Sequence, residues 1–242
     1  MEADLQNLSA DRLAVVTGAS RGIGLATAQI FRSKGWDVVN ISRSACAEPG
    51  VANLCADLAD LASLRASLEG LEQPIRNASQ ACVVHNAAHM RRDNYKSLDA
   101  EALMGVLSIN VAAPQCINQV LIPWLPPSSS VIFVGSTLSE KGAPNVLSYV
   151  TSKHALAGLM RATCQDLENA GIHCCLVAPG FTDTEMLRGE RSRGEANFDF
   201  VMDKLLMKRL IAPAEIAQVI YFCALNPVFN GAVMHANLGQ KD

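Results

Sequence analysis

Tyr149 and Lys153 are the residues of this sequence whose types and spacing most directly suggest chemistry. They stand four positions apart in the segment SYVTSKHAL, so in a helix both side chains would share one face. A free phenol has a pKa near 10, and a cation one helical turn away favours its ionised form. Tyr149 could therefore exchange a proton with a substrate, with Lys153 as its electrostatic partner. Most such pairs are only solvated surface residues, so the elements around the pair must distinguish the two interpretations.

The elements that would position this pair alternate between strands and helices. We expect strands near 13–18, 37–42, 81–86, 130–136, 172–180 and 231–236, and helices over 22–34, 60–72, 99–124, 149–170 and 213–225. Five of these strands are continuously apolar, which is typical of parallel strands covered on both faces. The pattern predicts an α/β fold, a doubly wound, Rossmann-type parallel sheet, in a single domain over residues 1–242 with an N-terminal extension over 1–11. Ligands of such sheets bind beyond the carboxyl ends of the strands.

A glycine-rich turn, TGASRGIG, follows the first strand and opens the first helix. Glycine lets the backbone approach a pyrophosphate, and the helix N-terminus supplies amide donors. The candidate cofactor-binding residues here are Gly18, Ser20, Arg21, Gly22, Ile23 and Gly24. Tight turns need glycine for other reasons, but a turn placed between a strand and a helix of an alternating chain indicates a dinucleotide site.

The second strand ends in ISRS, where a carboxylate that binds the ribose hydroxyls of NAD would be expected. Arg43 occupies that place, and Asp37 comes too early, at the start of the strand. Arg21 adds a second cation inside the glycine turn. Guanidinium groups pair with a 2′-phosphate, so we expect NADP(H) rather than NAD(H). The alternative is two solvated surface arginines.

The next two strand ends offer further cofactor contacts. Asp57, followed by Leu58, could accept a hydrogen bond from an adenine amino group, or it could cap the next helix, a role that Asp60 fits better. The strand ending in HNAA would let a cofactor lie close to the backbone at Asn86, Ala87 and Ala88.

Together these motifs resemble the short-chain dehydrogenase/reductase family. The resemblance is carried by TGASRGIG, HNAA, Asn110 in SINVAAP, Ser136 in VGS, Tyr149 and Lys153 in YVTSK, and PGFTDTEM, over about residues 12–240. The sequence looks closest to the 3-oxoacyl-(acyl-carrier-protein) reductases, through APGFTDTEM, PAEIAQVIYFCA and GAVMHANLG. The resemblance implies an NADPH-dependent carbonyl reductase, or alcohol dehydrogenase, that works by hydride transfer.

The family also implies a role for each residue of a catalytic tetrad. Tyr149 would be the general acid in reduction and the base in oxidation, while Lys153 would also bind the nicotinamide ribose. Ser136 would hold the substrate oxygen, a role for which Ser139 competes, although Ser139 falls in the loop beyond the strand. Asn110 would hold a water in a proton relay, and could also bond a backbone carbonyl at a helix bend.

The segment PGFTDT would close over the nicotinamide. Its candidate contacts are Pro179, Gly180, Thr182 and Thr184, although the threonines could instead cap the next helix. Residues 186–208 would form a mobile lid over the substrate. The chain departs from the family's usual Asn-Asn-Ala-Gly at His85 and Ala88, it has Asn-Leu-Gly near the end where two glycines are common, and its stretch between 43 and 57 is too short for the usual helix.

The resemblance leaves the substrate open, beyond a small-molecule carbonyl or alcohol. Acyl carrier protein is acidic, yet PWLPPSSS and CQDLENAG carry no lysine or arginine, which weakens the prediction of a carrier-bound thioester. Possible contacts remain at Arg161, Arg188, Arg191 and Arg193. A catalytically silent dinucleotide-binding sensor is the main alternative, but such a protein would typically have lost the tyrosine or lysine. A sugar-nucleotide epimerase would need a larger substrate domain.

The overall composition excludes several other classes. Among 242 residues, half are hydrophobic and the net charge is −3, so nothing indicates a nucleic-acid or membrane partner. No apolar run looks long enough to span a bilayer, and the acidic N-terminus is not a secretory signal. The eight cysteines read as reduced core residues of a cytoplasmic protein, and His85 and His89 lack partners for a metal site. The family implies a homotetramer or dimer, and small residues at 155, 157, 158 and 162 would permit close helix packing.

Overall fold

Short apolar runs form the strands of the sheet. The structure, a computed structural model, describes residues 5, 8, 10–192 and 198–241. Within them seven strands pair in the order β3-β2-β1-β4-β5-β6-β7, and every neighbouring pair is parallel. They are β1 (Arg12–Thr17), β2 (Asp37–Ser42), β3 (Val51–Cys55), β4 (Gln80–His85), β5 (Ser130–Val134), β6 (His173–Pro179) and β7 (Val233–Ala236). The predicted doubly wound parallel sheet is confirmed.

One strand, β3, was not predicted. Only Val51 and Ala52 of its five residues are buried, so this edge strand lacks the apolar run that marks the others. Its Asn53 instead makes polar contacts, accepting hydrogen bonds from Asn40 Nδ2 at 2.9 Å and from the Cys46 amide at 2.7 Å. The described segment between β2 and β3 contains no helix, as its shortness predicted.

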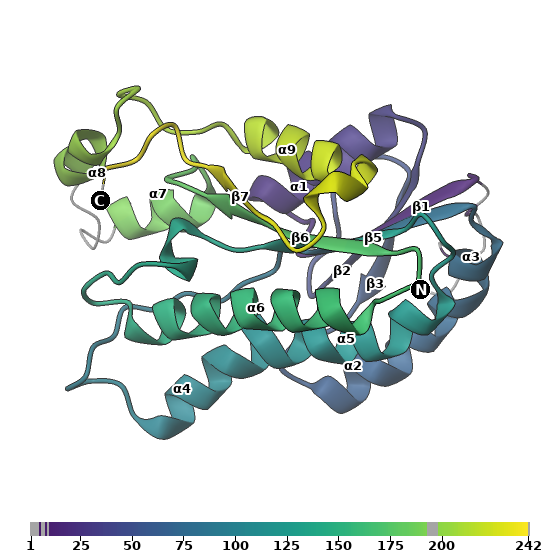
Figure 1. Cartoon of the computed structure of the whole chain (residues 1–242). Coiled ribbons are helices and arrows are strands. Elements are labelled where there is room, and N and C mark those ends of the chain that lie inside the picture. Colours follow the sequence, from purple (N-terminus) through teal and green to yellow (C-terminus); the bar gives the residue numbers. More distant parts are fainter. Residues whose placement is uncertain (1–4, 6–7, 9, 193–197, 242) are drawn as a thin grey trace.

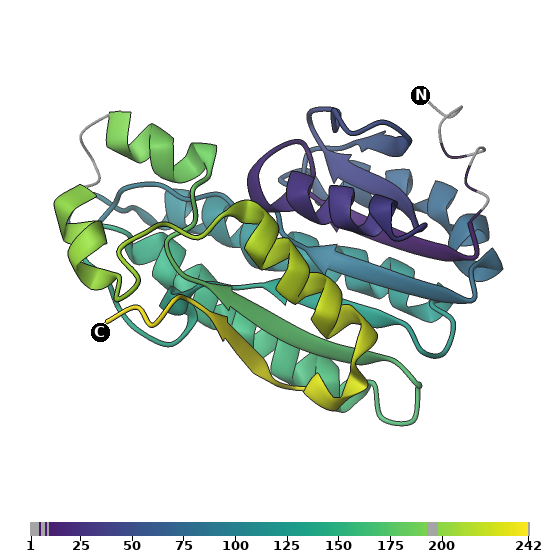
Figure 2. The same ribbon diagram turned by 90° about the horizontal axis from the view of Figure 1, so that it is seen from above.

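Helices cover both faces of the sheet. In Figure 1, α1 and α9 lie on one face, and α2, α5 and α6 lie on the other. The helices are α1 (Gly22–Ser33), α2 (Leu61–Leu68), α3 (Glu72–Asn77), α4 (Ala100–Leu107), α5 (Ala113–Leu121), α6 (Leu147–Asp166), α7 (Glu185–Ser192), α8 (Phe198–Lys204) and α9 (Pro213–Leu225). Both views place α7 and α8 at the end of the molecule where the chain terminates, away from the N-terminus (Figures 1 and 2).

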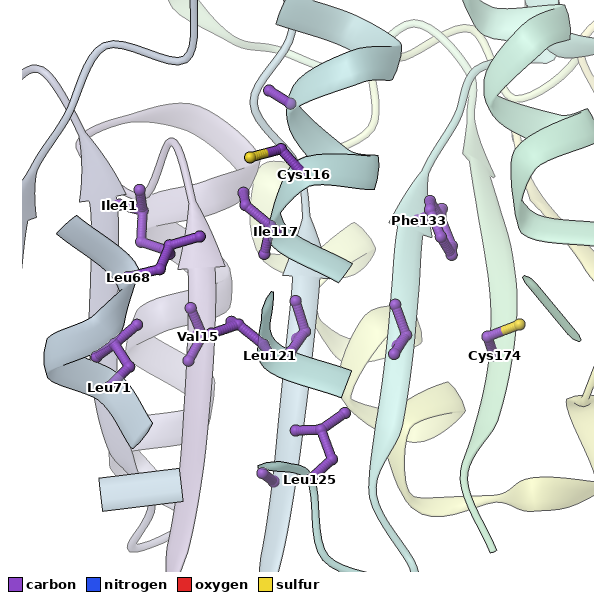
Figure 3. Close-up of a cluster of buried hydrophobic side chains, with 14 of the residues drawn as sticks. Val15, Ile41, Leu68, Leu71, Cys116, Ile117, Leu121, Leu125, Phe133 and Cys174 are labelled. Atoms are coloured by element: carbon purple, nitrogen blue, oxygen red, sulfur yellow. The ribbon is translucent and has the colours of Figure 1, made fainter. Parts of the chain in front are cut away.

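A buried apolar cluster fixes the sheet against α2 and α5. Figure 3 shows Ile117 and Leu121 of α5 directed at strand residues such as Val15, with Leu68 of α2 beside Ile41. All five side chains are at most 1% exposed. Burial of each such side chain contributes roughly 1.5–3 kcal/mol, so this layer holds the strand ends in a fixed arrangement.

The predicted helix over 99–124 is not regular. It consists of α4, a π-helical turn over Ser108–Ala112, α5, and a 3₁₀ turn over Ile122–Trp124. By length and composition alone the stretch Ala100–Trp124 is also apolar enough to cross a membrane, contrary to the sequence expectation. Its residues Ile117 and Leu121 are, however, fully buried in the core against the sheet. The π turn places Asn110 inside the protein, and such turns often occur at functional sites.

The strand order reverses beside β1. The chain runs outward from β1 through β2 to β3, then returns to add β4 and the later strands on the other side. Loops that leave the carboxyl ends of β1 and β4 therefore diverge, and a crevice opens between them.

Candidate active site

A cavity of about 1350 Å³ lies along the carboxyl ends of the strands. It is lined by eighteen of the predicted site residues: Gly18, Ser20, Arg21, Gly22, Ile23, Arg43, Asp57, Leu58, Asn86, Ala87, Ala88, Ser136, Tyr149, Lys153, Pro179, Gly180, Thr182 and Thr184. Two predicted residues, Gly24 and Asn110, are not part of the lining. One cavity therefore brings together the glycine turn, the two arginines and the Tyr–Lys pair.

Tyr149 and Lys153 lie on the first turns of α6 and face the cavity. Their exposed fractions are 9% and 2%. The Lys153 Nζ donates a hydrogen bond to the carbonyl of Val134 at 2.8 Å and stands 5.4 Å from the centre of the Tyr149 ring. Burial lowers the pKa of Lys153 to about 8. The lysine is therefore anchored to the end of β5 beside the phenol, and its charge can change within a few pH units of neutrality.

Ser136 rather than Ser139 reaches the cavity. Strand β5 ends at Val134, two residues earlier than Ser136, and a short 3₁₀ turn over Thr137–Ser139 follows. The Ser139 Oγ accepts from the Ser136 amide at 3.2 Å, and the Ser139 side chain is 3% exposed. The Ser136 Oγ accepts from the Leu138 amide at 3.1 Å, which leaves its hydroxyl hydrogen able to bond a ligand.

Asn110 holds the loop after β4 against α6. Its Oδ1 accepts from the His89 amide at 2.7 Å, and its Nδ2 donates to the His89 carbonyl and to the Ser152 Oγ, both at 2.9 Å. Ser152 in turn donates to the Tyr149 carbonyl at 2.7 Å. The alternative interpretation, a polar residue bonding backbone at a helix bend, is confirmed. The relay role of Asn110 stays a prediction.

Asp93 is a buried carboxylate at the site that the sequence analysis missed. Its side chain is fully buried and accepts from both the amide and the hydroxyl of Ser148, the amide at 3.0 Å. Arg91 Nε lies 3.6 Å from its Oδ2. The Asp93 backbone also forms a bridge with Val146. Asp93 thereby fixes the first turn of α6, next to Tyr149. No local pattern could reveal a partner 55 residues away.

The glycine turn fits a pyrophosphate. Gly18 has φ +69°, and a Cβ there would lie 3.1 Å from Ala87. The Asn86 amide group donates to the carbonyls of Thr17 (3.0 Å) and Gly18 (3.2 Å), which fixes the turn. Helix α1 begins at Gly22 without a side-chain cap, so its first amides are directed to the cavity end of the helix.

Gly24, in the first turn of α1, lets this helix pack closely against the glycine turn. A Cβ at this position would lie 2.2 Å from the Gly18 carbonyl oxygen. Only glycine allows α1 to approach the turn this closely, so Gly24 supports cofactor binding by packing rather than by contact.

The end of the cavity beyond β1 and β2, where the adenosine would bind, is lined by two cations, Arg21 and Arg43, and by the carboxylate of Asp57. Asp37 is held at the opposite end of β2, where it pairs with Arg32 at 3.2 Å and accepts from the Ala10 amide, so the prediction that it comes too early is confirmed. This arrangement suits a 2′-phosphate better than a free diol.

Of the two aspartates, Asp60 takes the capping role, and the adenine contact of Asp57 stays a prediction. Asp60 caps α2 by accepting from the Ser63 amide at 3.1 Å, as predicted. Asp57 lines the cavity, with one oxygen accepting from the Ala59 amide at 3.0 Å.

In the segment after β6, the two threonine hydroxyls form hydrogen bonds with backbone carbonyls. The hydroxyls of Thr182 and Thr184 donate to the carbonyls of Gly180 (3.0 Å) and Thr182 (3.5 Å), and Thr184 immediately precedes α7. Arg188 forms a two-pronged pair with Asp183, both bonds at 2.8 Å.

Of the other basic residues considered as substrate contacts, Arg161 does not join the cavity. Arg161 lies 3.6 Å from Glu140 and is not part of the lining. Arg193 lies outside the described residues, and the side chain of Arg191 is likewise not described.

His85, a departure from the family pattern, is a core residue. Its Nε2 bonds the Asn118 Oδ1 at 2.7 Å, and its ring packs 4.9 Å from that of Phe133. Burial lowers the pKa of His85 to about 4, so the ring is neutral at physiological pH.

His89 is exposed, and among the described residues no group of three or more His, Cys, Asp or Glu side chains could hold a metal. All eight cysteines are free.

Comparison with known proteins shows the family of this chain. A family model for short chain dehydrogenases matches residues 12–195, and the chain belongs to the short-chain dehydrogenase/reductase family of oxidoreductases. Protein FixR of Bradyrhizobium diazoefficiens is 30% identical over 262 residues, which cover 98% of this chain and 91% of the relative. The 3-oxoacyl-(acyl-carrier-protein) reductase FabG of Pseudomonas aeruginosa is 28% identical, over 95% of this chain and 97% of its own.

A solved structure is similar over almost the whole length. A blue fluorescent protein from a metagenomic library, in complex with NADPH, has a TM-score of 0.83 and 27% identity, covering 94% of this chain and 97% of its own.

Proposed function

We propose that the protein is an NADPH-dependent reductase of a small-molecule ketone or aldehyde, and that it can oxidise the corresponding alcohol. The observation that carries the proposal is the cavity itself. Ser136 from the end of β5 and Tyr149 and Lys153 from α6 share one cavity with a glycine turn shaped for a pyrophosphate. Such convergence of a proton donor, a cation and a dinucleotide cradle suits carbonyl reduction.

In this proposal bound NADPH supplies the hydride, and the chain controls the proton and the substrate's position. Ser136 donates a hydrogen bond to the substrate oxygen and orients it. Tyr149 delivers its phenolic proton to that oxygen as negative charge develops there. Lys153 stabilises the phenolate that is left. The predicted lid over 186–208, of which residues 193–197 lie outside the described residues, would exclude water.

The preference for NADPH rests on charge. Two arginines, Arg21 and Arg43, line the cavity beyond β1 and β2, and the similar metagenomic protein was solved with NADPH. Arg43→Ala should weaken NADPH binding by tenfold or more, because an ionic hydrogen bond contributes about 1.5–3 kcal/mol. NADH binding should change little. Equal use of NADH by the wild type would contradict the preference.

The test of the activity is NADPH oxidation against acetoacetyl thioesters, steroids, sugars and small diketones. Tyr149→Phe should lower kcat by about 10²–10⁴-fold while NADPH binding stays intact. A kcat within tenfold of the wild type in this variant would refute the role of Tyr149. If the protein binds NADPH yet reduces no member of the panel, the alternative of a silent dinucleotide sensor is favoured.

A carrier-bound 3-oxoacyl thioester is the second candidate substrate, because the FabG reductase is similar along the chain's whole length. Reduction of acetoacetyl-carrier protein at a higher kcat/KM than any small carbonyl would favour it.

The proposal includes a homotetramer or dimer. On α6, Ala155, Gly158 and Ala162 are exposed while Ala157 is buried, so three of the four predicted small residues could meet another helix. Light scattering at micromolar concentration should give a mass that is a multiple of 25.8 kDa. A monomer would contradict the prediction.

A further inference from the structure

Besides Lys153, four cations from four separate segments line the half of the cavity beyond the carboxyl ends of β4–β7. Arg92 follows β4, Lys141 follows β5, Lys204 ends α8 in the segment after β6, and Lys241 follows β7. Among the described lining residues of this half, Glu185 is the one carboxylate. The sequence alone could not group these cations, because they are spread over 150 positions of the chain.

These cations lie in the half of the cavity opposite the glycine turn and Arg43, the half left for the substrate in the proposed function. The cofactor's phosphates already have candidate partners in the other half, namely the α1 amides, Arg21 and Arg43, which follow β1 and β2. The loop that carries Arg92 also carries His89 and Asp93, which tie it to α6, and Lys141 lies in the segment that leads from β5 into α6. Charge in this half would therefore act on the substrate.

Apolar side chains line the same half. They are Met90, Leu138, Val146, Phe181, Met186, Leu187 and Val201. Val146 and Val201 are each only 4% exposed, so part of this lining is a firm apolar wall. A ligand that matches both features has an apolar segment and an anionic end.

We propose that the carbonyl substrate is an oxo carboxylic acid, in which an apolar segment separates the reacting carbonyl from the carboxylate. This inference rests on the proposed reductase function. A guanidinium such as that of Arg92 pairs with a carboxylate through two parallel bonds, and clustered cations raise the local concentration of an anion.

The substrate can bind to cations that already have partners within the protein. Arg92, Lys141 and Lys204 each already interact within the protein, so binding would exchange a protein partner for the carboxylate. Lys241 is exposed, and its amide donates to the Lys204 carbonyl at 2.8 Å, which holds the backbones of these two residues together.

The test compares each oxo acid with its methyl ester, which has the same reacting carbonyl and no charge. Suitable pairs are 4-oxopentanoate, 5-oxohexanoate and 7-oxooctanoate with their esters, at low and high salt. We expect the acid of at least one pair to have a kcat/KM tenfold or more above that of its ester. The advantage should shrink as salt increases.

Two variants locate the effect. Arg92→Gln and Lys241→Gln should each lower kcat/KM for the acid by threefold or more and leave that for the ester unchanged. Arg161→Gln, which removes an exposed cation outside the cavity, is the matched control and should alter neither. Binding of NADPH, followed by its fluorescence, should be the same in all variants.

The outcomes separate the inference from the proposed function. Esters reduced as well as acids, or variants that leave the acid's advantage intact, would overturn the inference while the reductase function stands. Acetoacetyl-coenzyme A reduced far better than every oxo acid would assign the cations to a phosphate and also overturn it. Reduction of no acid, ester or thioester by protein that binds NADPH would overturn both.

Discussion

Removal of the Asp93 carboxylate should damage both stability and catalysis. The Asp93 side chain is fully buried, and each of its two oxygens accepts a hydrogen bond from Ser148. Asp93→Ala leaves the Ser148 amide and hydroxyl without this partner at the start of α6. Each buried unsatisfied group costs about 1–3 kcal/mol, so we expect unfolding to become easier by about 3–5 kcal/mol in total.

Asp93→Ala should also slow turnover, because Tyr149 directly follows Ser148, the residue that Asp93 holds in place. A displacement of its hydroxyl by about 1 Å would lower kcat by up to about 10²-fold. Asp93→Asn keeps the shape: its Oδ1 can still accept from the Ser148 amide and its Nδ2 can donate to the hydroxyl. It should therefore cost only about 1–2 kcal/mol and recover most of kcat.

Urea unfolding and steady-state kinetics test this together. Asp99→Ala is the matched control, because Asp99 caps α4 in the same way, accepting from the Ala102 amide at 2.7 Å, but at an exposed site. It should cost about 1 kcal/mol and leave kcat unchanged. The reasoning would be refuted if Asp93→Ala cost no more than Asp99→Ala, or if kcat in Asp93→Ala equalled that of the wild type.

Three other predictions follow from burial and close packing. Because Lys153 loses its charge as pH rises through its pKa of about 8, reduction should slow above pH 8, and Lys153→Arg should shift this decline upward; an unchanged pH profile would argue against the lysine's role. His85 has a folded pKa of about 4 against 6.5 when unfolded, so stability is complete above pH 6.5 and falls by about 3 kcal/mol on going down to pH 4. Unfolding curves of His85→Asn should lack this loss. Gly24→Ala should abolish NADPH binding, since its Cβ would lie 2.2 Å from a backbone oxygen, whereas Gly105→Ala, with open space, should bind normally and melt slightly higher.

The sequence predicts the parts of this fold that local patterns encode. Buried parallel strands appear as apolar runs, and the glycine turn is recognisable because its spacing and its place after a strand have one structural purpose. The edge strand β3 escapes prediction because only Val51 and Ala52 of its five residues are buried, so no continuous apolar run marks it. The π turn at Asn110 escapes because an extra residue in a helix leaves no mark on hydrophobic spacing.

In the candidate site too, residues marked by a local pattern could be predicted, and residues brought together by tertiary contacts could not. Residues Ser136, Tyr149 and Lys153 could be chosen because each stands at the end of a strand or on the helix that follows. The contact of Asp93 with Ser148 could not be found, because the pairing is set by how two loops meet in space. The four cations that line the half of the cavity beyond β4–β7 could not be grouped for the same reason.

The packing of α1 against α9 sets the order in which the protein can fold during synthesis. The rings of Phe31 in α1 and Tyr221 in α9 meet edge-on at 5.1 Å, and the two helices together cover one face of the sheet. The glycine turn opens α1, yet this helix gains its cover only when residues 213–225 have been added. A nascent chain therefore exposes the apolar side of α1 until α9 has been made, and we expect it to bind the dinucleotide only after that point.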